Sequence, residues 1–329
     1  MAILVGIDEA GYGPHLGPLV VSAAALRLPG DLPPNPRLWF ALRGHVCRRP
    51  RTRTGRLVIC DSKDAYAARG PALLERATLG FLEACGQAPE TLSALLAQTD
   101  VPAGASENAS DAAGPWHRPK AMTLPAHTTA ADVARAAGHL TRGLAHLGGR
   151  CECLWINVAS PPRFNRLIET TRNKATALFG LAADLLNAAH RQWPADTIHV
   201  TMDCHGGRHY YAPLLAETFP MQTVRTLEES PGLSRYDLVR TSPGRQAAPI
   251  CFTIAQRCEQ RSLATALASM AAKYVRELHM RQLNAYFQAL VPGLRATAGY
   301  GRDAWRFLDD VAPARNAQGV PDATILRCR

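Results

Sequence analysis

Apolar runs separated by polar turns predict alternating strands and helices along most of the chain. Short runs of strand length predict buried strands; they span residues 3–7, 19–26, 151–160 and 197–203. Longer stretches with apolar residues every three or four positions predict helices; they begin near residue 70 and span 129–148, 161–193 and 262–290. Because the two kinds of element alternate, the pattern indicates an α/β fold around one sheet.

The first predicted strand runs directly into two acids, Asp8 and Glu9, and then into a glycine-rich turn. A desolvated carboxylate needs a partner, so acids at the end of a buried strand require an explanation. Side chains alternate along a strand, so we expect Asp8 and Glu9 to point to opposite sides. Gly11, Gly13 and Gly17 would let the backbone turn tightly or lie close to another group.

Composition limits the possible classes of protein. With 329 residues, 47% of them hydrophobic, the chain can form one large domain or two modest ones. No apolar run reaches membrane-spanning length, and the N-terminus lacks the features of a signal peptide, so we expect no membrane association. The nine cysteines are interpreted as reduced thiols, which predicts a cytoplasmic location. We also expect a monomer.

The formal net charge of +10 fits a phosphate-rich partner such as nucleic acid. Residues 41–56 contain no acid and six arginines: Arg43, Arg48, Arg49, Arg51, Arg53 and Arg56. One interpretation of this arginine arm is a solvated loop. The other is a flexible segment that follows a phosphate backbone.

Four carboxylates on separate predicted elements are candidates for a shared site: Asp8, Glu9, Asp203 and Glu277. Ser269, Lys273 and Glu277 are spaced by four on a predicted helix and share one face. Carboxylates can converge only where something cancels their charge, and hard divalent cations such as Mg²⁺ do this with oxygen ligands. Two such ions can clamp the attacking water and the leaving oxygen of a phosphodiester. Taken singly, each acid also fits a surface position or a helix cap.

Six sequence blocks, in the same order along the chain, resemble the type 2 ribonuclease H family, ribonucleases HII and HIII. The opening block is GIDEAGYGPHLGPLVVSAAAL, and the fifth is ALASMAAKYVRE. The other four are CDSKDAYAARGPALLERA, the region at 160–186, HVTMDCHGGRHYYAPLLAETFP and ATAGYGRDAWRFL. The resemblance covers most of the chain outside residues 28–56, 87–127 and 228–260.

This resemblance implies a ribonuclease H-like fold, with a central mixed sheet flanked by helices. We expect a single domain over residues 1–329, with insertions at 28–56, 87–127 and 228–260. A C-terminal helical segment, 278–329, would pack on the substrate side. The implied activity is hydrolysis of the RNA strand of RNA/DNA hybrids, or nicking at ribonucleotides in DNA.

The resemblance also implies roles for particular residues. The metal ligands for Mg²⁺ or Mn²⁺ would be Asp8, Glu9, Asp203 and Glu277. The substrate-binding residues would be Gly11, Tyr12, Gly13, Ser62, Lys63, Lys273 and Tyr300. Within that set, residues 11–13 would sense the ribose 2′-hydroxyl, the group that separates RNA from DNA. Ser62 and Lys63 would lie near backbone phosphate, and Tyr300 would pack against a sugar.

Two positions depart from the family pattern. Ribonucleases HII usually have arginine where this chain has Tyr12, and a tyrosine cannot make the same cationic contact with phosphate. They usually have aspartate as the fourth acid, where this chain has the longer Glu277.

Two other classes stay open from the sequence. Actin-like ATPases and sugar kinases share the superfold and also open with a strand, an aspartate and glycines. A non-catalytic protein that binds hybrids or branched nucleic acids is the second alternative, although clustered carboxylates oppose simple phosphate binding. Mg²⁺-dependent cleavage of a hybrid would distinguish an endonuclease from both.

Overall fold

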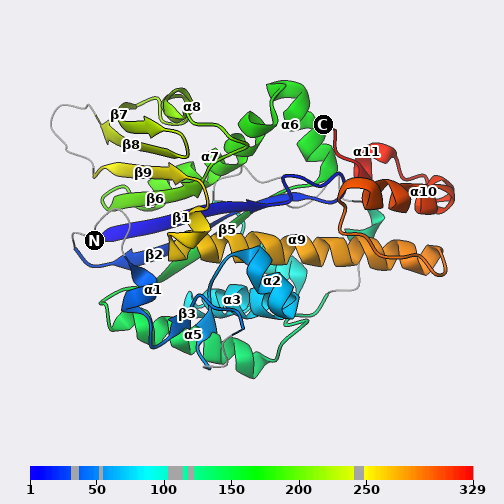
Figure 1. The fold of residues 1–329 in the computed structure, drawn as a ribbon, viewed down its shortest axis with the longest axis horizontal. Coiled ribbons are helices and arrows are strands. Elements are labelled where there is room, and N and C mark those ends of the chain that lie inside the picture. Colours follow the sequence, from blue (N-terminus) through cyan, green and yellow to red (C-terminus); the bar gives the residue numbers. More distant parts are fainter. Residues whose placement is uncertain (31–36, 52–54, 103–113, 118–121, 241–247, 329) are drawn as a thin grey trace.

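The computed structural model describes residues 1–30, 37–51, 55–102, 114–117, 122–240 and 248–328. Its centre is a seven-stranded mixed sheet in the order β5-β2-β1-β6-β9-β8-β7 (Figure 1). The strands are β1 (Ala2–Ala10), β2 (Leu19–Leu28), β5 (Arg150–Ala159), β6 (Thr197–Asp203), β7 (Gln222–Ser230), β8 (Leu233–Arg240) and β9 (Ile250–Ala255). Strands β1, β6 and β9 run parallel, and every other neighbouring pair is antiparallel. A separate two-stranded sheet joins β3 (Val46–Cys47) to β4 (Leu57–Val58).

Helices cover both faces of the sheet, as an α/β fold requires. They are α1 (Leu38–Ala41), α2 (Ser62–Arg69), α3 (Pro71–Ala84), α4 (Leu92–Gln98), α5 (Ala130–Ala145), α6 (Pro161–Thr171), α7 (Lys174–Gln192), α8 (Ala212–Thr218), α9 (Leu263–Leu290), α10 (Gly301–Ala317) and α11 (Asp322–Ile325). Two short 3₁₀ helices are η1 (Pro115–His117) and η2 (Cys258–Gln260). Within the described residues, no helix combines the length and apolar character needed to cross a membrane.

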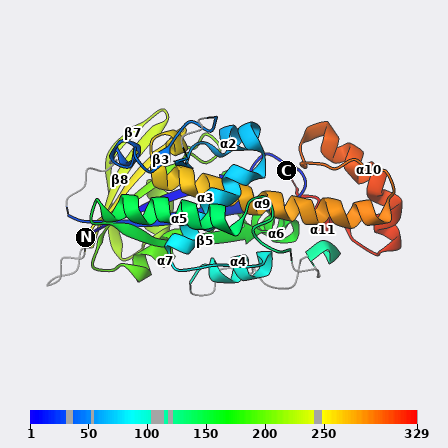
Figure 2. The ribbon, with the colours of Figure 1, turned by 90° about the horizontal axis from the view of Figure 1, so that it is seen from below.

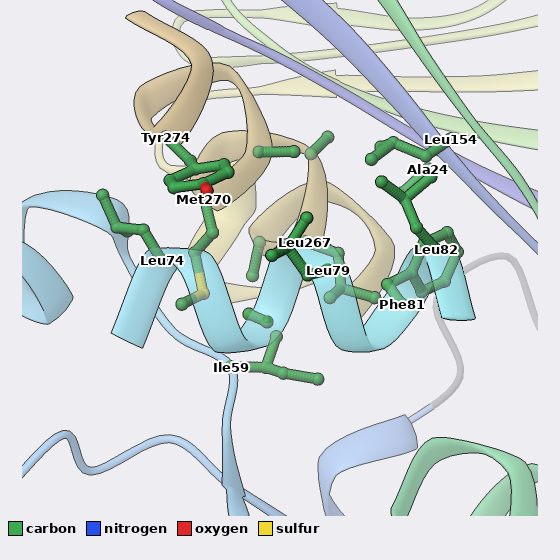
Figure 3. Packing of buried hydrophobic residues seen from close by; sticks show 14 of the residues in the cluster. Ala24, Ile59, Leu74, Leu79, Phe81, Leu82, Leu154, Leu267, Met270 and Tyr274 are labelled. Carbon is green, nitrogen blue, oxygen red and sulfur yellow. The ribbon is translucent and has the colours of Figure 1, made fainter. Parts of the chain in front are cut away.

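The long helix α9 lies along the middle of one face, with α3 beside it and α5 packed on α3 (Figures 1 and 2). Figure 3 shows how side chains of α3 (Leu74, Leu79) meet those of α9 (Leu267, Met270, Tyr274). Helix α7 packs on the opposite face against the odd-numbered residues of β1. Gly6 permits the close approach of α9, because a Cβ there would overlap the backbone at Ala264 and Thr265.

The α/β class and the mixed sheet flanked by helices, both expected from the sequence, are confirmed. The helix expected over 161–193 is two helices, because Arg172 adopts a left-handed conformation with φ +52°. The Asn173 side chain then caps α7 by accepting a hydrogen bond of 3.0 Å from the backbone N–H of Thr176. Helix α2 begins at Ser62, ahead of the helix that was expected from about residue 70.

The regions expected as insertions contain regular structure. Residues 228–260 include the end of β7, all of β8 and β9, and η2, so this region contributes to the central sheet itself. Residues 28–56 include α1 and β3, and 87–127 include α4 and η1. Parts of both latter regions lie outside the described residues.

Candidate active site at the carboxyl ends of β1 and β6

Three of the predicted carboxylates meet where parallel strands β1 and β6 end. Asp203 is the last residue of β6, and Ile7 pairs with Met202, which places Asp8 beside Asp203. Even-numbered Asp8 leaves β1 on the same face as Leu4, which belongs to the core that includes α9. Odd-numbered Glu9 leaves on the same face as Ile7, which belongs to the core that includes α7. Alternation along β1 thus starts the two side chains from opposite faces, yet their carboxyl groups come within hydrogen-bonding reach, because a side-chain hydrogen bond to Asp8 lowers the pKa of Glu9.

These three carboxylates destabilise one another's charged forms. Burial, reinforced by Glu9 and Asp203, raises the pKa of Asp8 well above its usual range. Burial and the charge of Asp203 raise the pKa of Glu9 to about 7, and burial raises the pKa of Asp203. Glu9 Oε2 is buried and has no hydrogen-bond partner among the described residues. The protein thus holds negative charge here without fully compensating it.

Residues of the second block, Ser62 and Lys63, lie at this cluster as well. Ser62 Oγ is 3.0 Å from Ser269 Oγ, and the Ser269 hydroxyl in turn hydrogen-bonds Asp8, which lowers the pKa of Asp8. Lys63 is close enough that its charge lowers the pKa of both Glu9 and Asp203. The short turn before α2 therefore contributes a hydroxyl and a cation to the carboxylate cluster.

A fourth acid at the cluster, Glu259 in η2, was missed by the sequence analysis. Burial, the charge of Asp203 and a side-chain hydrogen bond to Asp61 raise the pKa of Glu259 to about 7. Its position follows from the fold, because β9 runs parallel to β6 and Asp203 pairs with Ala255 at the end of β9. An acid shortly after an apolar strand was the signal, the same one that singled out Asp203.

Glu277 lies elsewhere. It accepts a 2.6 Å hydrogen bond from Lys273 Nζ, and this ammonium group also lies 4.8 Å from the ring centroid of Tyr66. Glu277 follows Ser269 by eight residues, which is about 12 Å along a helix. The raised pKa values of Asp8, Glu9 and Asp203 do not arise from Glu277. The structure therefore brings Glu259, and not Glu277, to the three strand carboxylates.

The glycine-rich turn after β1 is held close to α9. Gly11 has φ +95°, and a Cβ there would lie 2.6 Å from the carbonyl oxygen of Pro18. The Arg276 guanidinium is buried and donates to the carbonyl oxygens of Leu16, Pro18 and Ala298, at 3.2, 3.0 and 2.9 Å. A glycine at position 11 is thus required both by its backbone angle and by close packing.

Arg276 links this turn to the segment that carries Tyr300. Its guanidinium carbon lies 5.8 Å from the Tyr300 ring centroid. A Cβ on Gly13 would lie 3.8 Å from a ring carbon of Tyr300, and the Tyr300 side chain is 47% exposed. The structure therefore brings Gly11, Gly13 and Tyr300 together, with an aromatic ring open to solvent beside the turn.

Residues 326–328 close the other side of the glycine-rich turn. The N–H of Arg327 donates to the carbonyl of His15 at 2.9 Å, and Leu16 and Leu326 form an antiparallel bridge. The Arg327 guanidinium is buried and donates to the carbonyl of Pro14, and burial lowers its pKa to about 9. Residues 326–328 thus contact the turn directly. Arg276 and Arg327 together fix the backbone of the turn through its carbonyl oxygens.

The arginine arm is fixed at one point near the carboxylates. Arg48 Nη2 donates to the carbonyl of Gln260 at 2.6 Å, and its guanidinium lies 4.6 Å from the ring centroid of Trp39. Arg49 and Arg51 are exposed, and Arg53 lies outside the described residues. The arm begins next to η2, which carries Glu259.

The four carboxylates fit a divalent cation by donor type and by charge. Oxygen ligands with net negative charge are what Mg²⁺ and Mn²⁺ prefer, and the unpartnered Oε2 of Glu9 is a free donor atom. Within the described part of the chain, no three His, Cys, Asp or Glu side chains form a ready-made set of metal ligands. Side-chain rotation would be needed to bring these oxygens onto one ion.

Comparison with known proteins gives structural likenesses alone: no family model and no curated protein matches the chain. A ribonuclease HII of Archaeoglobus fulgidus, solved in a complex with PCNA, is 14% identical over 99% of this chain and 94% of that one, with a TM-score of 0.41. The ribonuclease H2 of Pyrococcus horikoshii OT3 is 11% identical over 98% and 92%, with a TM-score of 0.42. Bst-RNase HIII in complex with Mn²⁺ is 14% identical over 99% and 66%, with a TM-score of 0.39.

Likenesses at this level carry no argument about the activity of this chain, which has to rest on its own residues. The solved structures to which the chain is similar are ribonucleases HII and HIII, the same family that its sequence blocks resemble.

Proposed function

We propose that this protein is a metal-dependent endoribonuclease that hydrolyses the RNA strand of RNA/DNA hybrids or nicks DNA duplexes at ribonucleotides. The observation that carries the proposal is the convergence of Asp8, Glu9, Asp203 and Glu259. Burial raises the pKa of all four, and repulsion from neighbouring carboxylates adds to it for Asp8, Glu9 and Glu259. Carboxylates kept in such a position need a cation, and a net charge of +10 suits a polyanionic substrate.

In this proposal the four carboxylates hold two divalent ions, Mg²⁺ or Mn²⁺, with Glu259 in the role that the sequence assigned to Glu277. When bound, the ions would activate a water and stabilise the negative charge on the phosphodiester. Lys63 lowers the pKa of Glu9 and Asp203, so it helps to keep both in the anionic form that binds a cation. Ser269 and Ser62 orient the carboxylate of Asp8.

In this proposal, the glycine-rich turn distinguishes ribose from deoxyribose. The backbone at the exposed Gly13 can approach a sugar closely because this residue has no side chain, while Gly11 lets the turn pack against Pro18 and Arg276. The 2′-hydroxyl of that sugar can both donate and accept a hydrogen bond. The exposed ring of Tyr300 beside Gly13 supplies an apolar surface for the same sugar. Arg276 acts as a positioning residue, since it holds the turn and the Tyr300 segment in one arrangement.

A cleavage assay on matched duplexes tests the proposal. The substrates contain no ribonucleotide, one embedded ribonucleotide, or a tract of several, and Mg²⁺ or Mn²⁺ is supplied or chelated. We expect metal-dependent cleavage at or beside ribonucleotides and no cleavage of the all-DNA duplex. Comparable cleavage of all-DNA, or hydrolysis of ATP without nucleic acid, would contradict the assignment.

Two matched variants test which glutamate belongs to the site. Glu259→Gln removes a carboxylate from the cluster and should abolish metal-dependent cleavage. Glu277→Gln removes the same charge from α9, about 12 Å along the helix beyond Ser269, and should retain most activity. If Glu277→Gln is inactive and Glu259→Gln is active, Glu277 is the fourth ligand and the geometry described above is misread.

A further inference from the structure

A pair of cations stands on the Glu9 side of the carboxylate cluster, opposite the side where Asp8 meets α9. The two cations are Lys174, the first residue of α7, and Arg208, which follows β6. Between them and the carboxylates lies Tyr12, the second residue after β1. The charges of Glu9 and Arg208 both act on the Tyr12 hydroxyl, which places all three groups close together.

Tyr12 is fixed in position by its neighbours. A Cβ on Gly206 would lie 2.5 Å from the Tyr12 hydroxyl oxygen and 3.6 Å from Cβ of Ala175, so the ring lies between the turn after β6 and the start of α7. Lys174 Nζ lies 4.7 Å from the centroid of the same ring. This distance is within the range of a cation–π contact, which holds the ammonium group over the face of the ring.

Arg208 is held by the first turn of the same helix. Its Nη2 donates a 2.9 Å hydrogen bond to Thr176 Oγ1, and its Nε is buried with no hydrogen-bond partner among the described residues. The break at Arg172 and the Asn173 cap set where α7 begins. The same local structure therefore positions both cations.

The guanidinium of Arg208 is hydrogen-bonded to Thr176 and not to Glu9. Arg208 directs Nη2 to a neutral hydroxyl, although Glu9 Oε2 close by has no hydrogen-bond partner. The strongest influences on the pKa of Glu9 are burial and Asp203, and the cation that lowers it is Lys63. Two cations held beside an acidic centre, one of them with an unused buried donor, suit an anion that arrives with the substrate.

We propose that Lys174 and Arg208 form a phosphate subsite, which binds one backbone phosphate of the strand being cut, next to the phosphodiester at the carboxylates. The proposal rests on the proposed function and adds to it a cationic contact at the edge of the site. Tyr12 acts as the spacer that separates the two cations from Glu9. Backbone phosphate contacts of this kind set the register of a strand without reading its sequence.

The test measures binding separately from cleavage. Binding of a short RNA/DNA duplex is measured in Ca²⁺ as a function of salt for the wild type and for Lys174→Gln and Arg208→Gln. Each variant should bind roughly tenfold more weakly, with a log–log salt slope shallower by about 0.9. Because both cations hold the same phosphate, the salt slope of the double variant should be shallower by about 0.9 in total, and not by twice that amount. Lys174→Arg keeps the charge and should bind like the wild type.

Arg225→Gln is the matched control, since Arg225 is an exposed arginine on β7, outside the site. It should leave affinity and slope close to those of the wild type. In cleavage assays the subsite variants should raise KM with little change in kcat, because the bond to be broken is held elsewhere. Unfolding curves for each variant confirm that the fold is kept.

The outcomes separate the two proposals. If the wild type binds the hybrid and does not cleave it, the proposed function fails while the subsite remains measurable by binding. If Lys174→Gln and Arg208→Gln match the Arg225→Gln control in affinity and slope, the subsite is refuted even in an active enzyme. A fall in kcat at unchanged KM would equally overturn it, because it would place the two cations in the chemical step.

Discussion

Substitution of Glu9 by glutamine should stabilise the metal-free protein at alkaline pH. Glu9 is buried beside Asp203, and these surroundings raise its pKa from the usual 4.5 to about 7. A pKa difference of this size between the folded and unfolded chains corresponds to about 3 kcal/mol. The amide keeps the shape of the side chain and removes the charge.

The pH dependence has a definite sign. Between pH 4.5 and about 7 the folded chain retains a proton on Glu9 that the unfolded chain has released. The free energy of unfolding contributed by this group therefore falls as pH rises through that window, and the loss is complete above it. Glu9→Gln should accordingly be more stable than the wild type by up to about 3 kcal/mol at pH 8, and the difference should vanish near pH 4.5.

Urea denaturation in EDTA, followed by circular dichroism at several pH values, measures this difference. Glu217→Gln is the control, because Glu217 is exposed on α8 and its removal should change stability little at any pH. Added Mn²⁺ should reverse the order: the wild type gains about 4.1 kcal/mol at a concentration 1,000 times its Kd, and Glu9→Gln gains much less. A Glu9→Gln variant that is less stable than the wild type in EDTA at pH 8 would refute the reasoning, since it would mean that protein contacts already stabilise the carboxylate.

Two further predictions concern the periphery of the site. Replacing Arg48, Arg49 and Arg51 with alanine should weaken binding of RNA/DNA and DNA/DNA duplexes alike, and make the salt slope shallower by up to about 0.9 per lost contact; an unchanged slope would identify the arm as a solvated loop. Arg327→Met should lower the rate of cleavage of ribonucleotide substrates while the protein stays folded, because the Pro14 carbonyl loses its hydrogen-bond donor. If the Arg327→Met variant is folded, as judged by its unfolding curve, and cleaves as fast as the wild type at saturating metal, Arg327 does not position the turn for activity.

Much of the fold could be predicted from periodicity, since the strands of the sheet centre are short apolar runs. The predicted strand at 197–203 coincides with β6, and the predicted helix at 262–290 differs from α9 by one residue. In the region 228–260, β9 is such an apolar run although the sequence analysis did not single it out, whereas β7 could not be recognised in the same way. Strand β7 alternates exposed and half-buried positions at the edge of the sheet, so it lacks the apolar run that marks a central strand.

The carboxylates at the strand ends could be predicted from the sequence, whereas the fourth carboxylate of the cluster could not. Alternation along β1 was enough to place Asp8 and Glu9 on opposite sides, and strand polarity placed Asp203. Glu277 shares a helix face with Ser269, but a shared face does not fix a position along the helix axis. Glu259 follows an apolar strand, but its place beside Asp203 could be recognised only once β9 was known to run parallel to β6, and that pairing joins segments far apart in the sequence.

The break between α6 and α7 shows a different limit. Hydrophobic spacing continues through residues 161–193, so periodicity predicts one helix. The interruption depends on a left-handed residue, Arg172, and on the Asn173 cap, which are local backbone features that the apolar pattern does not record. That break places Lys174 over Tyr12, and so a feature invisible to periodicity sets the geometry of the proposed phosphate subsite.

The contact between the glycine-rich turn and residues 326–328 cannot form until the ribosome has added those residues. Arg327 and the carbonyl of Pro14 that it binds are 313 residues apart in sequence. At typical rates of translation that separation amounts to roughly 15–60 seconds. A ribosome-bound chain therefore carries Asp8 and Glu9 for most of this interval without the Arg327 contact that holds the glycine-rich turn. Under the proposed function, the site would stay incomplete until residues near 327 have been added.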